Sequence, residues 1–120
     1  MKRSDNFKKL IKNYNKENIK LAEVDYDSGQ DILYLYKKGE KAKFSVEVLE
    51  NFVIDVADNK IVGLEIFNAS KVLDVNKTDL KNIKKAELST LIIGKMYGVA
   101  YALQLEKFNL ESRLQIPMRI

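Results

Sequence analysis

Cysteine and histidine are both absent from the 120 residues. Without cysteine the chain has no disulfide, no thiolate nucleophile and no zinc site built on sulfur. Without histidine it lacks the usual acid–base group for neutral pH and the commonest metal ligand. Oxygen-ligated Mg²⁺ or Ca²⁺ is the metal chemistry that stays open. We therefore expect no cofactor, and we favour a protein that is not an enzyme.

Long apolar runs are also missing. A membrane-spanning helix needs roughly 20 apolar residues, and the most apolar stretch, TLIIGKMYGVAYAL, is interrupted by Gly94 and Lys95. The beginning of the chain is basic but has no apolar core of the kind that a signal peptide carries. We expect a soluble, cytoplasmic protein that does not contact a membrane.

The residues that are present suit one domain over 1–120, because 46% of them are hydrophobic, enough for a core. The net charge of +4 is unevenly spread. Residues 1–20 hold seven Lys or Arg against Asp5 and Glu17, whereas residues 21–36 hold four acids and no base. This distribution predicts a dipolar surface rather than a uniformly basic one.

The first segment, residues 1–19, has a helical period. Its apolar residues fall at i, i+3, i+4 and i+7, namely Phe7, Leu10, Ile11 and Tyr14. Ser4 or Asp5 can cap the first turn. The pattern predicts an N-terminal helical arm with one apolar stripe and a lysine-rich opposite face.

From Lys20 the apolar period changes to two, which is typical of strands. Turn residues separate the segments KLAEVDYD, DILYLYKK, AKFSVEVLE, NFVIDVA and KIVGLEIF. In the first turn we expect Asp27 to bond the backbone and Gly29 to take the left-handed conformation.

Two short helical turns, NASKVLDV and TDLKNI, follow, the second with Thr78 as its expected N-cap. Alternation then returns over residues 99–106 and 114–120. Because Pro117 cannot donate to a ladder, we expect the last strand at a sheet edge. The predicted fold class is α+β: an N-terminal helix plus a large, mainly antiparallel meander sheet with short helical turns in the middle. The sheet core spans 20–76, and a short helix and C-terminal strands span 77–120.

Residues 26–73 resemble an uncharacterised family, domain of unknown function 2283. The resemblance rests on Tyr26-Asp27, the strand from Asp31 to Tyr36, VIDV at 53–56, GLEI at 63–66 and Ala69-Ser70. It implies a small sheet-rich α+β domain without an established activity. Some relatives look like partners of small toxin-like proteins, so the resemblance also makes an antitoxin-like role conceivable.

Four acidic residues are candidate ligand-binding groups: Asp27, Asp31, Asp55 and Glu65. If they converged, they could bind Mg²⁺ or perform acid–base chemistry. The structural interpretation, which we favour, has Asp27 closing a turn and Asp31 starting a strand. Asp55 and Glu65 would then lie roughly opposite each other across a hairpin, where like charges repel unless they face solvent, find lysines, or share a proton or cation.

Ser70 lacks a histidine to activate it, and we favour a helix cap over a serine–lysine pair with Lys71 or Lys77. Basic Lys8, Lys9 and Lys12 could contact nucleic acid or an acidic partner. We favour a solvated helix face for them.

Several strands are apolar on both faces, which predicts burial on both sides. Either the sheet closes as a barrel or sandwich, or a second copy covers it. We favour a homodimer with part of 94–120 in the interface. The favoured function is a non-enzymatic protein-interaction module that binds through a sheet edge. The alternatives are an antitoxin-like or nucleic-acid-associated regulator, and a carboxylate-based metal binder or hydrolase.

Overall fold

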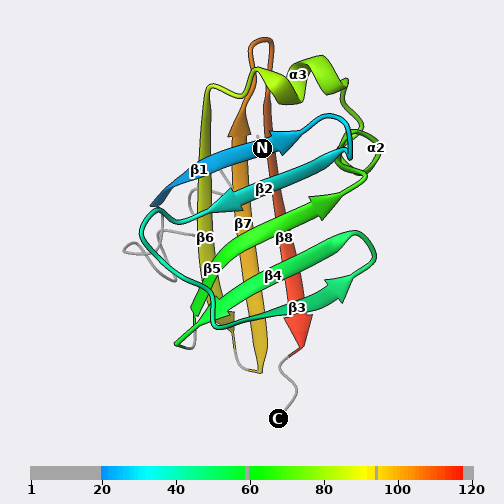
Figure 1. Cartoon of the computed structure of the whole chain (residues 1–120). Helices are drawn as coiled ribbons and strands as arrows, with labels where there is room; N and C mark the ends of the chain where they lie inside the picture. The colour runs from blue at the N-terminus through cyan, green and yellow to red at the C-terminus, as the bar shows by residue number, and fades with distance from the viewer. Residues whose placement is uncertain (1–19, 59, 94, 118–120) are drawn as a thin grey trace.

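The computed structural model describes residues 20–58, 60–93 and 95–117 (Figure 1). These ranges form eight strands and two short helices. In chain order they are β1 (Lys20–Asp27), β2 (Ile32–Tyr36), β3 (Phe44–Leu49), β4 (Phe52–Ala57), β5 (Lys60–Phe67), α2 (Ala69–Val72), α3 (Lys77–Lys81), β6 (Lys85–Ile93), β7 (Met96–Gln104) and β8 (Asn109–Pro117).

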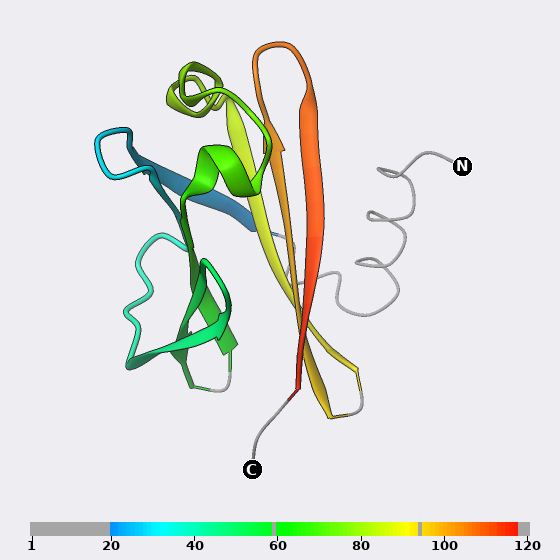
Figure 2. The same ribbon diagram turned by 90° about the vertical axis from the view of Figure 1, so that its right-hand side faces the viewer.

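All strand pairs are antiparallel, in the order β3-β4-β5-β2-β1-β6-β7-β8. Strand β1 belongs to two ladders. Its Lys20–Ala22 part pairs with β6, and its Glu23–Asp27 part pairs with β2. The sheet folds over at this strand, so a five-stranded layer (β1–β5) crosses in front of a three-stranded layer (β6–β8) (Figures 1 and 2). The fold is a half-barrel whose two layers face each other.

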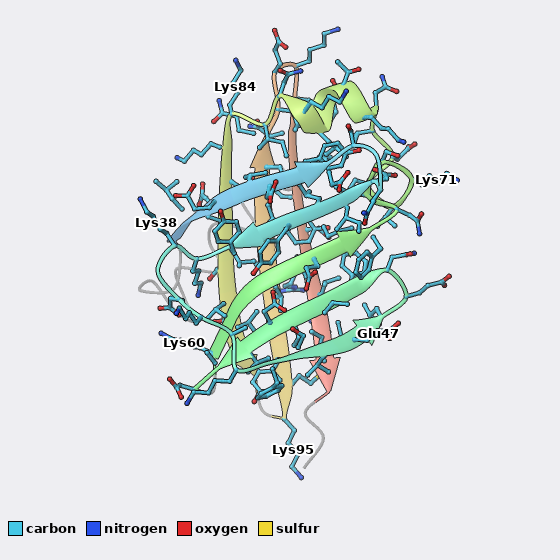
Figure 3. All side chains as sticks on the ribbon, in the orientation of Figure 1. Lys38, Glu47, Lys60, Lys71, Lys84 and Lys95 are labelled. Carbon is cyan, nitrogen blue, oxygen red and sulfur yellow. The ribbon has the colours of Figure 1, made fainter. Side chains whose placement is uncertain are left out.

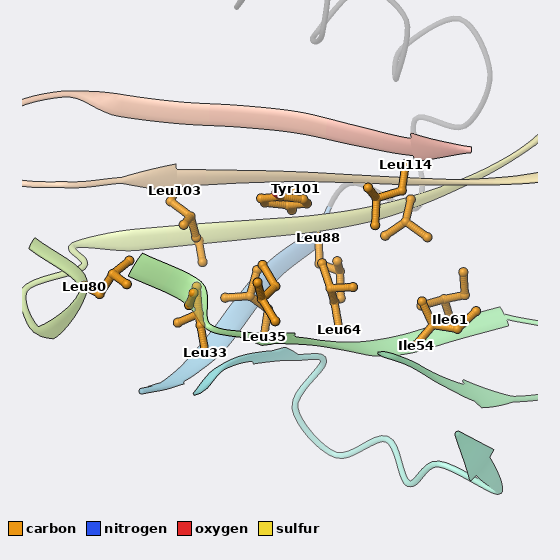
Figure 4. Packing of buried hydrophobic residues seen from close by; sticks show 14 of the residues in the cluster. Leu33, Leu35, Ile54, Ile61, Leu64, Leu80, Leu88, Tyr101, Leu103 and Leu114 are labelled. Carbon is orange, nitrogen blue, oxygen red and sulfur yellow. The ribbon is translucent and has the colours of Figure 1, made fainter. Parts of the chain in front are cut away.

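The hydrophobic core fills the space between the two layers (Figure 4). Alternate residues of each strand point into it, as the period of two predicts. Leu33, Leu35 and Leu64 from the five-stranded layer are fully buried there, as is Leu88 from the three-stranded layer. Leu80 of α3 joins the same cluster. The short helix therefore contributes to the core between the layers.

The predicted α+β class is wrong. The helices of the described ranges have only four and five residues, and the protein is mainly antiparallel β-structure. The sheet folds so that its own C-terminal layer covers the first five strands (Figures 1 and 2). The helix predicted for 1–19 lies outside the described residues. No helix within the described ranges is long and apolar enough to cross a membrane.

The predicted local elements are mostly confirmed. The hairpin strands and both short helical turns form where the sequence places them, and β8, which ends at Pro117, is an edge strand. Two turn predictions are wrong. Asp31, at φ 56°, takes the left-handed conformation in place of Gly29. Helix α3 has Asn76 as its N-cap in place of Thr78.

The C-terminal strands hide their apolar side chains within the chain. Val99, Tyr101 and Leu103 of β7 and Leu114 of β8 are buried in the core cluster. The sandwich that we weighed against a dimer thus accounts for this surface. The apolar faces that motivated an interface at 94–120 need no second copy, and self-association stays a prediction.

Leu64 offers a test of the folded-over core. Leu64→Ala removes a side chain with 0% exposure, and we expect a loss of about 2–5 kcal/mol in the free energy of unfolding, since a cavity remains. Urea unfolding followed by circular dichroism measures it. The control is Leu21→Ala, because Leu21 is 67% exposed. Equal losses from the two variants would contradict the assigned layer packing.

Candidate functional site

Asp31 is the centre of the first polar cluster. It is buried at the start of β2, and its left-handed backbone turns the side chain toward α2. Its carboxylate accepts a hydrogen bond from the Tyr26 hydroxyl at 2.6 Å and one from the Ser70 hydroxyl at 2.7 Å. The Ser70 backbone N–H donates to both oxygens, at 3.1 and 3.2 Å. Asp31 thereby connects the β1–β2 turn to a helix 39 residues further along the chain.

Asp31 also holds α2 through its backbone, because its carbonyl accepts the N–H of Ala69 at 3.0 Å. The first turn of a helix has N–H groups without intrahelical partners. Asn68, the N-cap residue of α2, makes no side-chain capping bond. Asp31 supplies the missing acceptors from another element. The predicted role of Ser70 as a helix cap is therefore wrong: Ser70 donates to the residue that caps α2.

The hydrogen bonds fix the protonation states in this cluster. Burial acts to raise the pKa of Asp31, but the bonds from Tyr26 and Ser70 outweigh it, aided by Lys77, and the pKa lies below its usual value. Burial and the bond to Asp31 raise the pKa of Tyr26 to about 12. At neutral pH Asp31 is a carboxylate and Tyr26 is a neutral donor.

Asp27 lies apart from this cluster. It is exposed, and its Oδ1 accepts the backbone N–H of Gln30 at 3.0 Å. The structural prediction that Asp27 closes a turn is confirmed.

Asp55 and Glu65 form a second polar cluster, on the face of the five-stranded layer that points away from the core. Asp55 pairs with Gly63, and Glu65 pairs with Val53. We expected the two acids to lie roughly opposite each other, but they are offset by two residues. The offset follows from the hairpin register, because Ala57 pairs with Lys60 and the register shifts between Asp55 and Val56. They are diagonal neighbours on one face, and their side chains still hydrogen bond to each other.

Two ionised carboxylates offer only acceptors, so a hydrogen bond between these acids requires a proton on one of them. Burial and the neighbouring charge of Asp55 raise the pKa of Glu65. Asp55 is the more buried of the pair and accepts a bond from the Ser45 hydroxyl at 2.5 Å. The Tyr34 hydroxyl also bonds to Asp55, and burial together with this bond raises the pKa of Tyr34 to about 12. Glu65 therefore keeps its proton to a higher pH than an ordinary glutamate does.

Gly63 makes room for the second cluster. A Cβ atom at this position would lie 2.7 Å from Asp55 Oδ2 and 3.0 Å from a ring carbon of Tyr34. Only glycine lets the carboxylate and the phenol meet over the strand. The side chains that pack against this glycine are therefore the polar ones of Asp55 and Tyr34.

Tyr34 and Tyr36 stack beside the cluster, with ring centroids 4.8 Å apart. Both are half-buried, as expected for tyrosines in strands.

The four acidic candidates therefore do not converge: Asp31 and the Asp55–Glu65 pair belong to separate clusters, and Asp27 belongs to neither. Among the described residues, no group of three or more His, Cys, Asp or Glu could hold a metal ion. The hydroxyl of Ser70 donates to Asp31, which is a structural use. Lys8, Lys9 and Lys12 lie outside the described residues.

Strand β3 carries a surface that the sequence did not single out. It is an edge strand, paired with β4 alone. Phe44 and Val46 stand opposite Val56 and Ile54, so they lie on the core-side face, yet they are 57% and 38% exposed. Leu49 is exposed as well. The alternation in AKFSVEVLE predicts a strand with an apolar face, but not that this face stays exposed.

The other edge of the sheet is different. Leu114 and Ile116 of β8 are buried, and Pro117 ends the strand without a donor. The open apolar edge of the described sheet is therefore β3, and Glu47 marks its outer face (Figure 3).

The geometry defines a small antiparallel half-barrel with two polar clusters, and its sequence is similar to known proteins. The family described as "Protein of unknown function (DUF2283)" matches residues 23–70, the range that contains both clusters. An uncharacterized protein of Methanocaldococcus jannaschii is 36% identical over 97 residues, which is 79% of either chain. The chain belongs to this family of unknown function.

A second relative comes from Methanosarcina mazei, and its name gives it a provisional assignment as a hypoxanthine phosphoribosyltransferase. It is 32% identical over 68 residues, which cover 56% of this chain and 54% of that protein. This chain thus spans about half of that relative's length. No solved structure is significantly similar to the chain.

Asp31→Asn tests the first cluster, because asparagine also tolerates a positive φ. Since the folded pKa of Asp31 is lowered, its contribution to stability is present above the unfolded pKa of about 3.9 and is lost as the pH falls through the folded pKa. We expect a loss of about 1–3 kcal/mol at pH 7 that shrinks in acid. Urea unfolding from pH 7 to 2 measures it. Asp74→Asn is the control, as Asp74 is exposed with φ 55°, and a similar loss there would refute the role of Asp31.

Glu65→Gln tests the second cluster with the opposite sign. Since the folded pKa of Glu65 is raised, its contribution is present at low pH and is lost as the pH rises through the folded pKa. Glutamine keeps a donor toward Asp55 without the charge, so we expect a gain on the order of 0.2–1 kcal/mol at pH 7 that vanishes in acid. Thermal unfolding of the variant and the native chain at pH 7 and in acid measures this difference in stability. Glu47→Gln on exposed β3 is the control, and a gain shared by both variants would argue against the carboxyl pair.

Proposed function

We propose that the protein is a non-enzymatic interaction module that pairs the free edge of β3 with a strand of another polypeptide. The observation that carries the proposal is the exposure of Phe44 and Val46 on an edge strand. An edge strand offers unpaired N–H and C=O groups, and an added strand gains affinity from them and specificity from alternate side chains. Proteins usually protect such edges with charge, proline or a cover.

The polar clusters support the same function because their hydrogen bonds hold α2 and β3 in place. Asp31, Tyr26 and Ser70 bond to one another and hold α2. Asp55 bonds to Ser45 of β3, and so it fixes the edge strand on its neighbour β4. The buried acceptor at Asp55 thus keeps β3 in register, ready for a partner on its other side.

We do not extend the Methanosarcina name to this chain, because the similarity covers 54% of that relative. An antitoxin-like or nucleic-acid-associated role and a carboxylate-based metal site have no specific support in the described geometry. The β3 edge is the exposed apolar surface that a partner strand would cover.

Photo-crosslinking in the host cell tests the proposal. A photoreactive phenylalanine analogue, benzoylphenylalanine, replaces Phe44 in the full chain. We expect it to capture a polypeptide on irradiation, since the edge is occupied in the cell. The matched control carries the analogue at Phe108, which is 41% exposed in the β7–β8 turn, and we expect no specific product there. Equal products at both positions, or none at Phe44, would refute the proposal.

A further inference from the structure

The three-stranded layer has a second face, which points away from the core. Leu88 of β6 and Val99 and Tyr101 of β7 belong to the core cluster, so the residues that alternate with them lie on the opposite face. Ser89 and Ala100 are cross-strand partners on this outer face. Each is only 1% exposed, although Ala100 does not belong to the core cluster. Their burial therefore requires a cover on the outer side of the layer.

The described elements do not provide this cover. The five-stranded layer packs on the core side, where α2 and α3 add Ala69 and Leu80 to the cluster. Figure 2 shows all these elements on one side of β6–β8. Arg113 of β8 is the partner of Ala100 on the outer face, but it is itself exposed and lies two strands, or about 10 Å, from Ser89. One exposed side chain does not bury both residues.

Ser89 adds an independent observation. Its hydroxyl oxygen is buried and has no hydrogen-bond partner within the part of the chain that the structure describes. Buried hydroxyl groups are nearly always paired, because an unpaired one has lost its bonds to water. The outer face therefore offers an enclosed donor and acceptor to the segment that covers it.

Residues 1–19 are the segment that can reach this face. The other residues outside the described ranges come singly or as the last three of the chain, which are too few to cover two strands. The segment directly precedes Lys20, which pairs with Leu88, the neighbour of Ser89 in β6. Even at a compact rise of about 1.5 Å per residue, 19 residues reach about 28 Å. That length is close to the roughly 30 Å of a nine-residue strand such as β7.

The side chains on the two sides are complementary in size. Strand β7 presents a row of small residues on the outer face, namely Gly98, Ala100 and Ala102. The segment supplies four large apolar side chains: Phe7, Leu10, Ile11 and Tyr14. Large side chains facing small ones fill the space between two layers without voids.

We propose that residues 1–19 dock on the outer face of β6–β8 of their own chain, with their apolar side chains over Ser89 and Ala100. The direct connection to β1 gives the segment a high effective concentration at this face. The docking surface lies on the three-stranded layer, so it is separate from the β3 edge. Both faces of the three-stranded layer are then covered from within the chain, which leaves the β3 edge as the open apolar surface.

Thiol accessibility tests the docking, because the native chain has no cysteine. Ser89→Cys places a single thiol on the outer face. We expect this thiol to react with dithiobis(nitrobenzoic acid) at least tenfold more slowly than that of Thr78→Cys, because Thr78 is exposed on α3. Adding Leu10→Asp and Ile11→Asp removes the apolar contact, so we expect the rate at position 89 to rise at least tenfold. Equal rates for the two single-thiol chains, or protection that survives the aspartates, would overturn the proposal.

Two controls accompany this measurement. Asn13→Asp with Asn15→Asp adds the same charge to the segment but keeps its apolar residues, so the thiol at position 89 stays protected. Ala86→Cys places a thiol on the core side of the same strand, where Ala86 is 2% exposed. We expect that thiol to stay protected when Leu10 and Ile11 are replaced, since docking is lost and the core is not. Equal acceleration at positions 86 and 89 would show unfolding instead of undocking.

Photo-crosslinking locates the segment without a destabilising substitution, and it decides the question if the aspartate variant unfolds. Benzoylphenylalanine replaces Tyr14, an aromatic for an aromatic, in a purified mixture of isotope-labelled and unlabelled full chains. By mass spectrometry we expect adducts to β6–β8 peptides of the same chain. Adducts mainly to β2–β5 peptides, or no peptide adduct, would overturn the docking. Adducts mainly between labelled and unlabelled chains would assign the cover to a second copy and overturn docking within one chain.

Discussion

The double pairing of β1 is the constraint on which the rest of the structure depends. One end of the strand completes the three-stranded layer, and the other end completes the five-stranded layer. Because different ends of β1 pair with β6 and with β2, the two layers diverge from this strand and their apolar faces meet. The apolar side chains of both layers are buried between them, so the chain covers its own apolar faces.

Folding the sheet leaves polar groups that must be accommodated, and the two clusters do this differently. In the first, a buried charge is retained because three donors surround Asp31, and the carboxylate in turn caps a helix from far along the chain. In the second, burial and the charge of Asp55 raise the pKa of Glu65. Donors favour the charged form of a buried acid, whereas burial and a like charge favour its neutral form, and the two clusters show one effect each.

Both clusters make hydrogen bonds within the fold, whereas the edge of the sheet at β3 keeps unpaired backbone groups. At the edge strand β3, apolar side chains and backbone groups stay exposed together. The bond from Ser45 to Asp55 orders this strand from its inner side. Ser45 thus links the second cluster to the edge strand.

The sequence by itself determined the local elements. Alternation gave the strands, turn residues gave their ends, and Pro117 placed the last strand at an edge, because these signals depend on neighbouring residues and backbone chemistry. The family pattern also follows from the sequence, and it includes Tyr26, Asp31 and Ser70 of the first cluster and Asp55 and Gly63 of the second. The sequence pattern does not show that these residues form two clusters rather than one.

Tertiary structure alone decided how the layers meet, and hence the class of the fold. The hairpin register offset Asp55 from Glu65, and a left-handed Asp31 took the place that we expected for Gly29. Alternation cannot distinguish an apolar face that packs against another layer from an apolar face that stays exposed, since both carry the same kinds of residue. Whether Phe44 is buried or exposed therefore depends on where strands far away in the chain lie, which no local pattern encodes.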